Sequence, residues 1–323
     1  MTQDMFPDQA QSQRFKLGLV GVGRMGETHL RALQDVETID VVAGVDTRPE
    51  IRASLAARGL RTYQSVPEML GSEKIDGALV AVPTPFHLET IRALVESAVP
   101  VLCEKPCGLN PGQAREAGDL ARTNGVLLQI GFWRRFIPEL QQLRDRVREG
   151  ELGELYVVSC LQWDEYPAPV SFRATSGGIL KDMGVHEFDM IRWLAGQEIV
   201  AASGYASSVR IEPPVPGEPE GMELAVQLSA GTVGRISLGR RFPAGEIHRI
   251  EVLGTQGSEE LTYAPPGSAW EPWGPIYPAL RAQAHAFAAA VQGGEVAGAT
   301  AEDAAAALEA AELAARGLVP GSA

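Results

Sequence analysis

The 323-residue sequence has few cysteines and no long apolar run. Cys103, Cys107 and Cys160 are its three cysteines, a small and odd number that argues against a disulfide framework. Cys103 and Cys107 are four residues apart, but no second pair with ligand spacing accompanies them, so we expect buried thiols and no metal. No run reaches the roughly 18 apolar residues of a membrane span, and residues 1–14 lack the features of a signal peptide. We therefore expect a cytoplasmic protein, without a membrane partner, whose residues 1–14 form a disordered tail.

Positive charge is also scarce, since 28 lysines and arginines face 41 aspartates and glutamates and give a formal net charge of −13. Nucleic acids and anionic membranes attract clustered lysine and arginine, so neither is an expected partner. Such a surface fits a small neutral or cationic molecule. Apolar residues make up 45% and charged residues 21%, as in ordinary globular proteins, and the length suggests two domains.

The first part of the chain alternates short apolar strands with amphipathic helices. Strands are predicted over 15–23, 39–46, 75–83, 99–106 and 126–132, and helices over 24–36, 49–58, 87–98 and 111–125. Strands that are apolar throughout form parallel sheets with helices on both faces. Residues 15–136 are therefore predicted to form a doubly wound α/β domain.

The pattern changes after residue 137. Helices are predicted over 138–150, 177–196, 281–294 and 300–317. Between them, apolar and polar residues alternate along strands with glycine at the turns, which is typical of an antiparallel meander. Residues 137–323 are thus predicted to form a second α/β domain with a large, open, mostly antiparallel sheet.

Three glycines with G-x-G-x-x-G spacing lie between the first strand and the first helix. Gly21 would make the tight turn, Gly23 would let a pyrophosphate approach the backbone, and Gly26 would let helix and strand pack closely. The helix N-terminus offers free N–H groups to phosphates, so Arg24 and Met25 belong to the same predicted cofactor site. The alternative is a strand–turn–helix corner that needs glycine for its shape alone.

Asp46 ends the second strand, 20 residues after Gly26. A carboxylate there can accept hydrogen bonds from ribose hydroxyls and would repel a 2′-phosphate, which favours NAD over NADP. Arg48 also belongs to this site, and its guanidinium could offset the repulsion.

Two more strand ends should face the same crevice. One carries Thr84 and His87, and the other carries Glu104 and Lys105, so all four are candidate cofactor residues. Lys105 is either a solvated surface lysine or a functional one. Pro106 could hold the Lys105–Pro106 peptide bond cis.

The stretch 177–196 reads "GGILKDMGVHEFDMIRWLAG" and places Asp182, His186 and Asp189 on one face of an α-helix. Burying carboxylates without partners is costly. The row could face solvent, form a structural His–Asp pair, or, less consistently with its ligand set, bind zinc. It could also make His186 a general base tuned by Asp182, as alcohol oxidation beside a nicotinamide requires.

The motifs "GVGRMG", "EKP" and "GGILKDMGVHEFD", in this order, resemble those of the glucose–fructose oxidoreductase / inositol dehydrogenase / rhizopine-catabolism (Gfo/Idh/MocA) family. The resemblance runs from about residue 15 to 317. It implies an N-terminal Rossmann domain and a C-terminal α/β domain whose open sheet usually mediates oligomerisation, hence a homodimer or homotetramer. It also implies that Lys105 holds the reacting hydroxyl, His186 is the acid/base, and Asp182 supports both.

The same resemblance implies a substrate site that includes Trp133, Arg134, Asp164 and Asp189 beside the catalytic residues. Trp133 and Trp163 stand where a smaller residue and an arginine are usual, which affects the substrate rather than the chemistry. We predict an NAD-dependent dehydrogenase that oxidises a secondary hydroxyl of an inositol-like polyol. The alternatives are a pyranose or anhydrosugar dehydrogenase, and a non-catalytic NAD(P)-binding sensor or structural protein. Such a non-catalytic relative would typically lack the lysine or the histidine that this sequence has.

Overall fold

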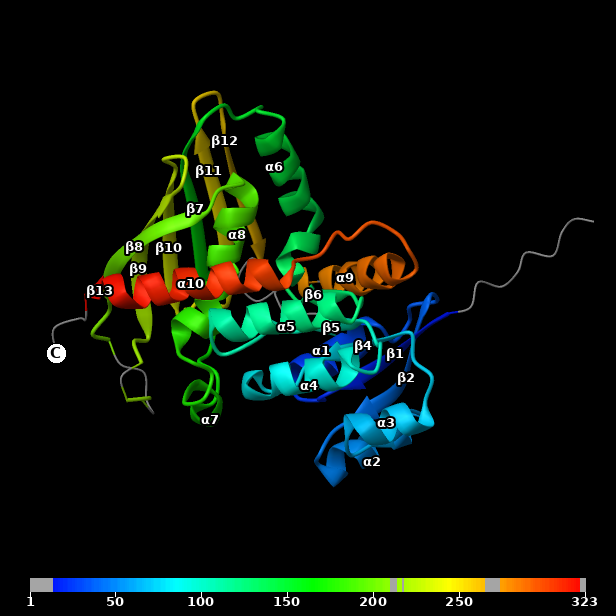
Figure 1. Cartoon of the computed structure of the whole chain (residues 1–323). Coiled ribbons are helices and arrows are strands. Elements are labelled where there is room, and N and C mark those ends of the chain that lie inside the picture. Colours follow the sequence, from blue (N-terminus) through cyan, green and yellow to red (C-terminus); the bar gives the residue numbers. More distant parts are fainter. Residues whose placement is uncertain (1–13, 210–213, 217, 265–273, 320–323) are drawn as a thin grey trace, which may run out of the picture.

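The structure is a computed structural model that describes residues 14–209, 214–216, 218–264 and 274–319. Two sheets dominate it, one of six strands and one of seven, each covered by helices (Figure 1). Apart from Arg14, the predicted tail 1–14 lies outside the described residues. Within the described ranges, no helix is both long and apolar enough to traverse a bilayer.

The first sheet is parallel throughout, with strand order β3-β2-β1-β4-β5-β6. Its strands are β1 (Phe15–Val20), β2 (Ile39–Val45), β3 (Arg61–Tyr63), β4 (Gly77–Val80), β5 (Val101–Cys103) and β6 (Leu128–Ile130). The helices between them are α1 (Arg24–Ala32), α2 (Pro49–Ala57), α3 (Val66–Ser72), α4 (His87–Val95) and α5 (Pro111–Thr123). The predicted doubly wound domain is confirmed. β3 and α3 were not predicted, because both are short and β3 has no fully buried residue.

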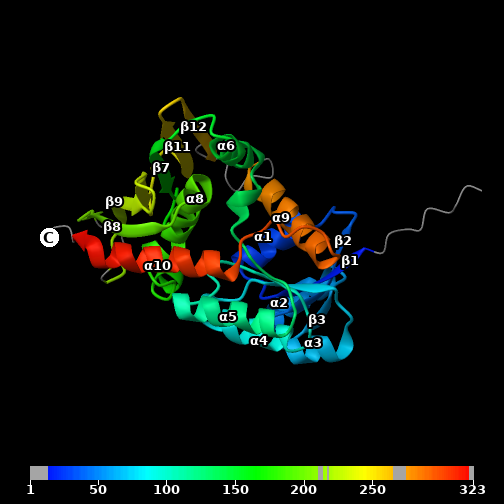
Figure 2. The same ribbon diagram turned by 45° about the horizontal axis from the view of Figure 1, so that its top comes forward.

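A helix from the far end of the chain completes this domain. α9 (Ile276–Val291) lies against α1, as Figure 2 shows, and its Phe287 ring stacks edge-on with Phe15 at 5.9 Å. Phe287 shares an apolar core with Leu30 of α1 and Leu55 of α2. The prediction that 137–323 is one domain therefore needs a qualification: in space, α9 covers the first sheet. The boundary at residue 136 itself stays a prediction.

The second sheet has strand order β12-β11-β7-β10-β9-β8-β13. Its strands are β7 (Leu155–Trp163), β8 (Ile199–Ala206), β9 (Gly221–Leu228), β10 (Val233–Gly239), β11 (Ile247–Gly254), β12 (Ser258–Ala264) and β13 (Leu318–Val319). Most pairs are antiparallel, as predicted, but β7 is inserted parallel to β10 and β13 pairs parallel with β8. The sheet is therefore no simple meander.

Helices cover one face of this sheet, and none of the described helices covers the other. Leu224, Val226 and Ile236 are buried beneath the helices, whereas Tyr205 and Val233 on the opposite face are 70% and 39% exposed. Homo-oligomerisation through that open face stays a prediction.

The second sheet packs against α6 (Pro138–Arg148), α8 (Val185–Ala195) and α10 (Ala301–Gly317). The short α7 (Val170–Arg173) lies between β7 and α8 in the chain. α10 crosses the sheet and lies along α5 of the first domain (Figures 1 and 2). The predicted single α-helix over 177–196 is wrong in its first half. A π-helical turn, η3 (Leu180–Gly184), precedes α8, and its wider turn offsets Asp182 from the α-helical face on which it was expected.

Candidate active site

The glycine loop has the geometry of a dinucleotide cradle. Gly21 has φ +86°, and a Cβ there would lie 2.7 Å from the Val82 nitrogen. A Cβ on Gly26 would lie 2.1 Å from the Gly21 carbonyl oxygen, so helix and loop can meet only because residue 26 has no side chain. A Cβ on Gly23 would meet nothing within 4 Å, which leaves the open space that a pyrophosphate would occupy.

Asp46 and Arg48 lie beside this loop as predicted. Asp46 Oδ2 accepts a hydrogen bond from the Val22 N–H at 3.0 Å, and its Oδ1 accepts from the Arg48 backbone and Nε. Burial raises the pKa of Asp46, but the hydrogen bonds from Arg48 outweigh it, so the pKa lies below its usual value. A hollow of about 300 Å³ opens between loop, α1 and α2 and is lined by Val22, Gly23, Arg24, Glu27, Arg48, Ile51, Ser54 and Leu55. The adenosine ribose of NAD is predicted to lie at this position, beside Asp46.

These contacts give different expectations for two alanine substitutions. Gly23→Ala should fold normally, because residue 23 has φ −80° and free space, but it should weaken NAD binding about tenfold, or about 1.4 kcal/mol. Gly26→Ala should lower the free energy of unfolding by about 2 kcal/mol, because its Cβ meets fixed backbone. Thermal unfolding and titration with NAD measure both effects. A folded Gly23→Ala variant with unchanged NAD affinity would contradict this assignment of the loop.

The other predicted cofactor residues have mostly internal partners. Glu104 is buried and its Oε1 lies 2.7 Å from His29 Nε2, which ties the end of β5 to α1. His87 is buried, its Nε2 hydrogen-bonds the Val82 carbonyl oxygen at 2.9 Å, and burial lowers its pKa to about 4. Thr84 begins a short 3₁₀ turn, η1 (Thr84–Phe86), and is partly exposed at the strand end. Glu104 and His87 thus shape the crevice, and their contact with cofactor stays a prediction, as does that of Thr84, Arg24 and Met25.

Lys105, Asp182 and His186 come together between the two sheets. The Lys105–Pro106 bond is cis. Lys105 Nζ donates to the Asp182 carbonyl oxygen at 2.7 Å and lies 3.6 Å from Asp182 Oδ1. His186, one turn further along, is 7% exposed, and its ring centroid lies 6.4 Å from that of Trp133. The structure thus brings these residues together with Trp133, and their roles in catalysis and substrate binding stay predictions.

The surroundings set the protonation states of this group. Burial raises the pKa of Asp182, but the charges of Lys105 and Arg240 outweigh it and hold the pKa below its usual value. Burial, assisted by the charges of Lys105 and Arg134, lowers the pKa of His186 well below its ordinary value. His186 is therefore neutral at neutral pH and its ring can accept a proton. Its Nδ1 is buried, and none of the described residues forms a hydrogen bond with it.

Asp164 lies at the rim of the same site. It follows Trp163, whose antiparallel partner is Ile247, so Asp164 is opposite Glu246. Burial and the charge of Glu246 raise the pKa of Asp164 to about 7, and the charge of Asp182 contributes in the same direction. The charge of Arg24 from the cofactor loop acts on both Asp164 and Asp182. The two domains therefore meet here.

Arg134 and Asp189 do not face the site, in contrast to the prediction from the family resemblance. Arg134 is 1% exposed and pairs with Glu187, and its Nη2 donates to Gln162 at 2.8 Å. Asp189 is fully buried, and both of its oxygens accept hydrogen bonds from Arg135. Each would have to break a buried ion pair to reach a substrate, so we omit both from the proposed substrate site.

The sequence reasoning missed several buried partners of the site. Arg240 lies 2.6 Å from Asp182 Oδ2, and Glu218 holds its other nitrogen at 2.7 Å. His29 and Glu187 are the hidden partners of Glu104 and Arg134. A charged residue directly after an alternating strand, as Arg240 follows β10, was the one available signal.

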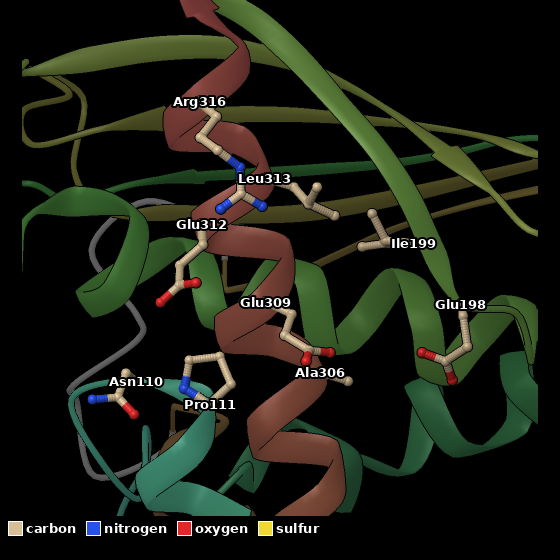
Figure 3. Close-up of a pocket in the computed structure, with 9 residues that line it drawn as sticks. All are labelled: Asn110, Pro111, Glu198, Ile199, Ala306, Glu309, Glu312, Leu313 and Arg316. Carbon is tan, nitrogen blue, oxygen red and sulfur yellow. The ribbon is translucent and has the colours of Figure 1, made fainter.

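A second hollow, of about 590 Å³, lies away from this chemistry, along α10 and the start of α5 (Figure 3). Its three glutamates lie beside cations: Glu198 beside Arg192, Glu309 beside Arg115, and Glu312 at 4.0 Å from Lys181. In the described part of the chain, no group of three or more His, Cys, Asp and Glu side chains could hold a metal ion.

The dinucleotide loop and the proton-handling side chains meet between the two sheets, which is the arrangement of a dinucleotide-dependent oxidoreductase. Residues 15–132 match the family model described as "Oxidoreductase family, NAD-binding Rossmann fold", and residues 140–260 match the "GFO/IDH/MocA C-terminal domain". The chain belongs to the Gfo/Idh/MocA oxidoreductase family and is an NAD-dependent dehydrogenase. The family and the fold predicted from the sequence are thereby confirmed, as is NAD as the cofactor.

Individual relatives agree along almost the full length. The chain is 46% identical to the rhizopine catabolism protein MocA of Rhizobium meliloti over 303 residues, covering 93% of this chain and 94% of that one. It is 35% identical to the myo-inositol dehydrogenase Hyg17 of Streptomyces leeuwenhoekii, covering 86% and 89%. The crystal structure of a myo-inositol dehydrogenase from Corynebacterium glutamicum superimposes with a TM-score of 0.83 at 27% identity, covering 95% and 98%.

Proposed function

We propose that the protein oxidises a secondary hydroxyl of a cyclic polyol of the myo- or scyllo-inositol type to the ketone. The observation that carries this proposal is the contact of Lys105 with Asp182 next to a buried, neutral His186. These are the groups that alcohol oxidation needs, because one must hold the hydroxyl and another must take its proton.

In the proposed reaction, bound NAD supplies the acceptor for the hydride that leaves the carbinol carbon. Lys105 donates a hydrogen bond to the reacting oxygen and so orients it and stabilises its developing negative charge. The His186 ring accepts the hydroxyl proton, and Asp182 keeps Lys105 in place through its carbonyl and Oδ1. The C–H and O–H bonds break as the carbonyl π bond forms, which balances the step.

The relatives support the polyol as substrate class. Two of the three described above bear the name myo-inositol dehydrogenase, at 35% and 27% identity. The 46% identical relative is named for rhizopine catabolism, so rhizopine is a further candidate substrate for the screen. Trp133, which is largely buried and flanks His186, offers an apolar wall for a ring, and Asp164 offers a carboxyl group for hydroxyls.

A spectrophotometric screen identifies the substrate. The purified protein should reduce NAD, measured as NADH absorbance, when myo- or scyllo-inositol or a simple derivative is added. Aldoses should give a slower reaction. NADP in place of NAD should lower kcat/KM, because Asp46 repels a 2′-phosphate. Activity with aldopyranoses and none with any inositol would replace the proposal with a sugar dehydrogenase. NAD binding without turnover of any polyol or sugar would indicate a non-catalytic protein.

A further inference from the structure

Arg240 is a completely buried guanidinium that contacts the proposed catalytic group. It follows β10 directly, has 0% exposure, and donates from Nη1 to Asp182 Oδ2 at 2.6 Å. Its Nη2 donates to Glu218 Oε1 at 2.7 Å, and Glu218 is itself buried. Taking such a charge out of water is costly and is offset only when both sides of the fork are well paired.

The two oxygens of the Asp182 carboxylate have different cationic neighbours. Oδ2 is held by Arg240 on one side, and Oδ1 lies 3.6 Å from Lys105 Nζ on the other. Lys105, Asp182, Arg240 and Glu218 thus form a row of alternating charge that runs from the crevice into the second domain. Only Lys105 and Asp182 lie at the crevice, with side chains 17% and 12% exposed.

We propose that Arg240, oriented by Glu218, is a positioning residue that fixes the Asp182 carboxylate beside Lys105 for the dehydrogenase reaction. The inference rests on the proposed function, because it assigns Arg240 a role in that reaction. A lysine could not replace it fully, since a single ammonium group on a shorter reach does not reproduce two divergent N–H bonds.

A purely structural ion pair is the competing explanation, and the chain contains a matched control for it. Glu220, two residues after Glu218, is also buried and pairs with buried Arg173, whose Nη1 lies 2.9 and 3.0 Å from its two oxygens. Both pairs therefore anchor the same segment to its surroundings. Only the Glu218 pair reaches Asp182.

The experiment compares Arg240→Lys, Arg240→Gln and Glu218→Gln with Glu220→Gln in the full-length enzyme. Each is assayed for kcat and KM with NAD and the polyol found by the screen, for NAD affinity, for urea unfolding and for the pH dependence of kcat. We expect Arg240→Gln to lower kcat about 100-fold, Glu218→Gln about tenfold, and Arg240→Lys to retain part of the lost rate, because a small misplacement of a catalytic group is that costly. NAD affinity should not change, and Glu220→Gln should lose stability with kcat within about twofold of the wild type.

The pH profile separates positioning from stability. The charged groups that act on Asp182 are Lys105, Arg240 and Arg24, which lower its pKa. Asp164, whose pKa is raised to about 7 partly by the charge of Asp182, is uncharged in the pH range where Asp182 titrates. Removing Arg240 takes away one of the cations, so the acid limb of kcat should move to higher pH in Arg240→Gln and stay in place in Glu220→Gln.

Two results would overturn the inference. The first is that Glu218→Gln and Arg240→Lys lose stability as Glu220→Gln does but keep the kcat and the pH profile of the wild type. These two milder variants still test the inference if Arg240→Gln does not fold. If the wild type turns over no polyol or sugar, the proposed function fails instead. Crystal structures of the variants then test whether Arg240 and Glu218 hold the Asp182 carboxylate in place. The second overturning result is an Asp182 carboxylate that stays beside Lys105 in the structures of Glu218→Gln and Arg240→Lys, because it would refute the positioning role.

Discussion

His186→Ala should lower kcat by about 10²- to 10⁴-fold, the range that a positioned general base contributes. The physical reason is that His186 is the one neutral, buried imidazole beside Lys105 and Asp182 in the described part of the chain, and alanine leaves no acceptor for the hydroxyl proton. NAD affinity should change little, because the glycine loop and Asp46 belong to the other domain. Stopped-flow measurement of NADH formation and titration with NAD check the two halves of this prediction.

A matched control is His285→Ala on the exposed side of α9, where the imidazole contacts Thr38 far from the crevice. It should leave kcat unchanged. Turnover of His186→Ala within about threefold of the wild type would refute the proton-acceptor role. Partial recovery of the variant by added imidazole would support it, because the side chain leaves a cavity when it is truncated.

The cofactor half of the site was predictable because its signals are local. Gly21, Gly23 and Gly26 lie within six residues, and each is required by the backbone around it: a positive φ, an open approach and a close contact. Asp46 ends a strand that is parallel to the first and adjacent to it, so topology alone brings it to the loop. The apolar pattern predicts both strands, and in a parallel sheet their carboxyl ends lie at the same edge, beside the loop.

The substrate half was only partly predictable because its contacts are distant in sequence. Arg240 binds Asp182 across 58 residues, and Arg135 binds Asp189 across 54. Helical spacing correctly flagged Asp182, His186 and Asp189 as unusual polar residues, but it could not distinguish a residue that faces the crevice from one that pairs with an arginine in the core. The π-helical turn Leu180–Gly184 made the prediction harder still, because helical spacing assumes 3.6 residues per turn and so misplaces Asp182.

The last two helices, α9 and α10, were predictable as helices, but their positions in the fold were not. Alanine-rich sequence predicts α9 and α10 well, because alanine has the highest helix propensity. Their destinations depend on packing. α9 returns to α1 through Phe287, and α10 lies against α5, α8 and β8. The first domain is thus completed by the last quarter of the chain.

Lys105→Met should lower kcat/KM by about 10²- to 10³-fold while the protein stays folded, because methionine fills a similar volume but neither donates a hydrogen bond nor carries charge. The structural reason is that Lys105 Nζ is the cation beside both Asp182 and the neutral His186, and it donates to the Asp182 carbonyl at 2.7 Å. Loss of this charge also has a definite sign in the pH profile. Lys105 lowers the pKa values of Asp182 and His186, so its removal raises both, and the acid limb of kcat/KM should move to higher pH.

Lys181→Met is the matched control for this change. Lys181 lies one residue before Asp182, and its Nζ also donates to a backbone carbonyl, that of Leu109 at 2.8 Å. Within the described residues, the acidic partner of its ammonium group is Glu312, at 4.0 Å, and not Asp182. A role for lysine in local backbone packing alone predicts equal effects of the two substitutions on stability and none on the pH profile. A role in holding the reacting hydroxyl predicts that only Lys105→Met loses turnover and shifts the acid limb. Equal kcat/KM for the two variants would remove Lys105 from the chemistry and leave His186 and Asp182 without the cation that sets their protonation states.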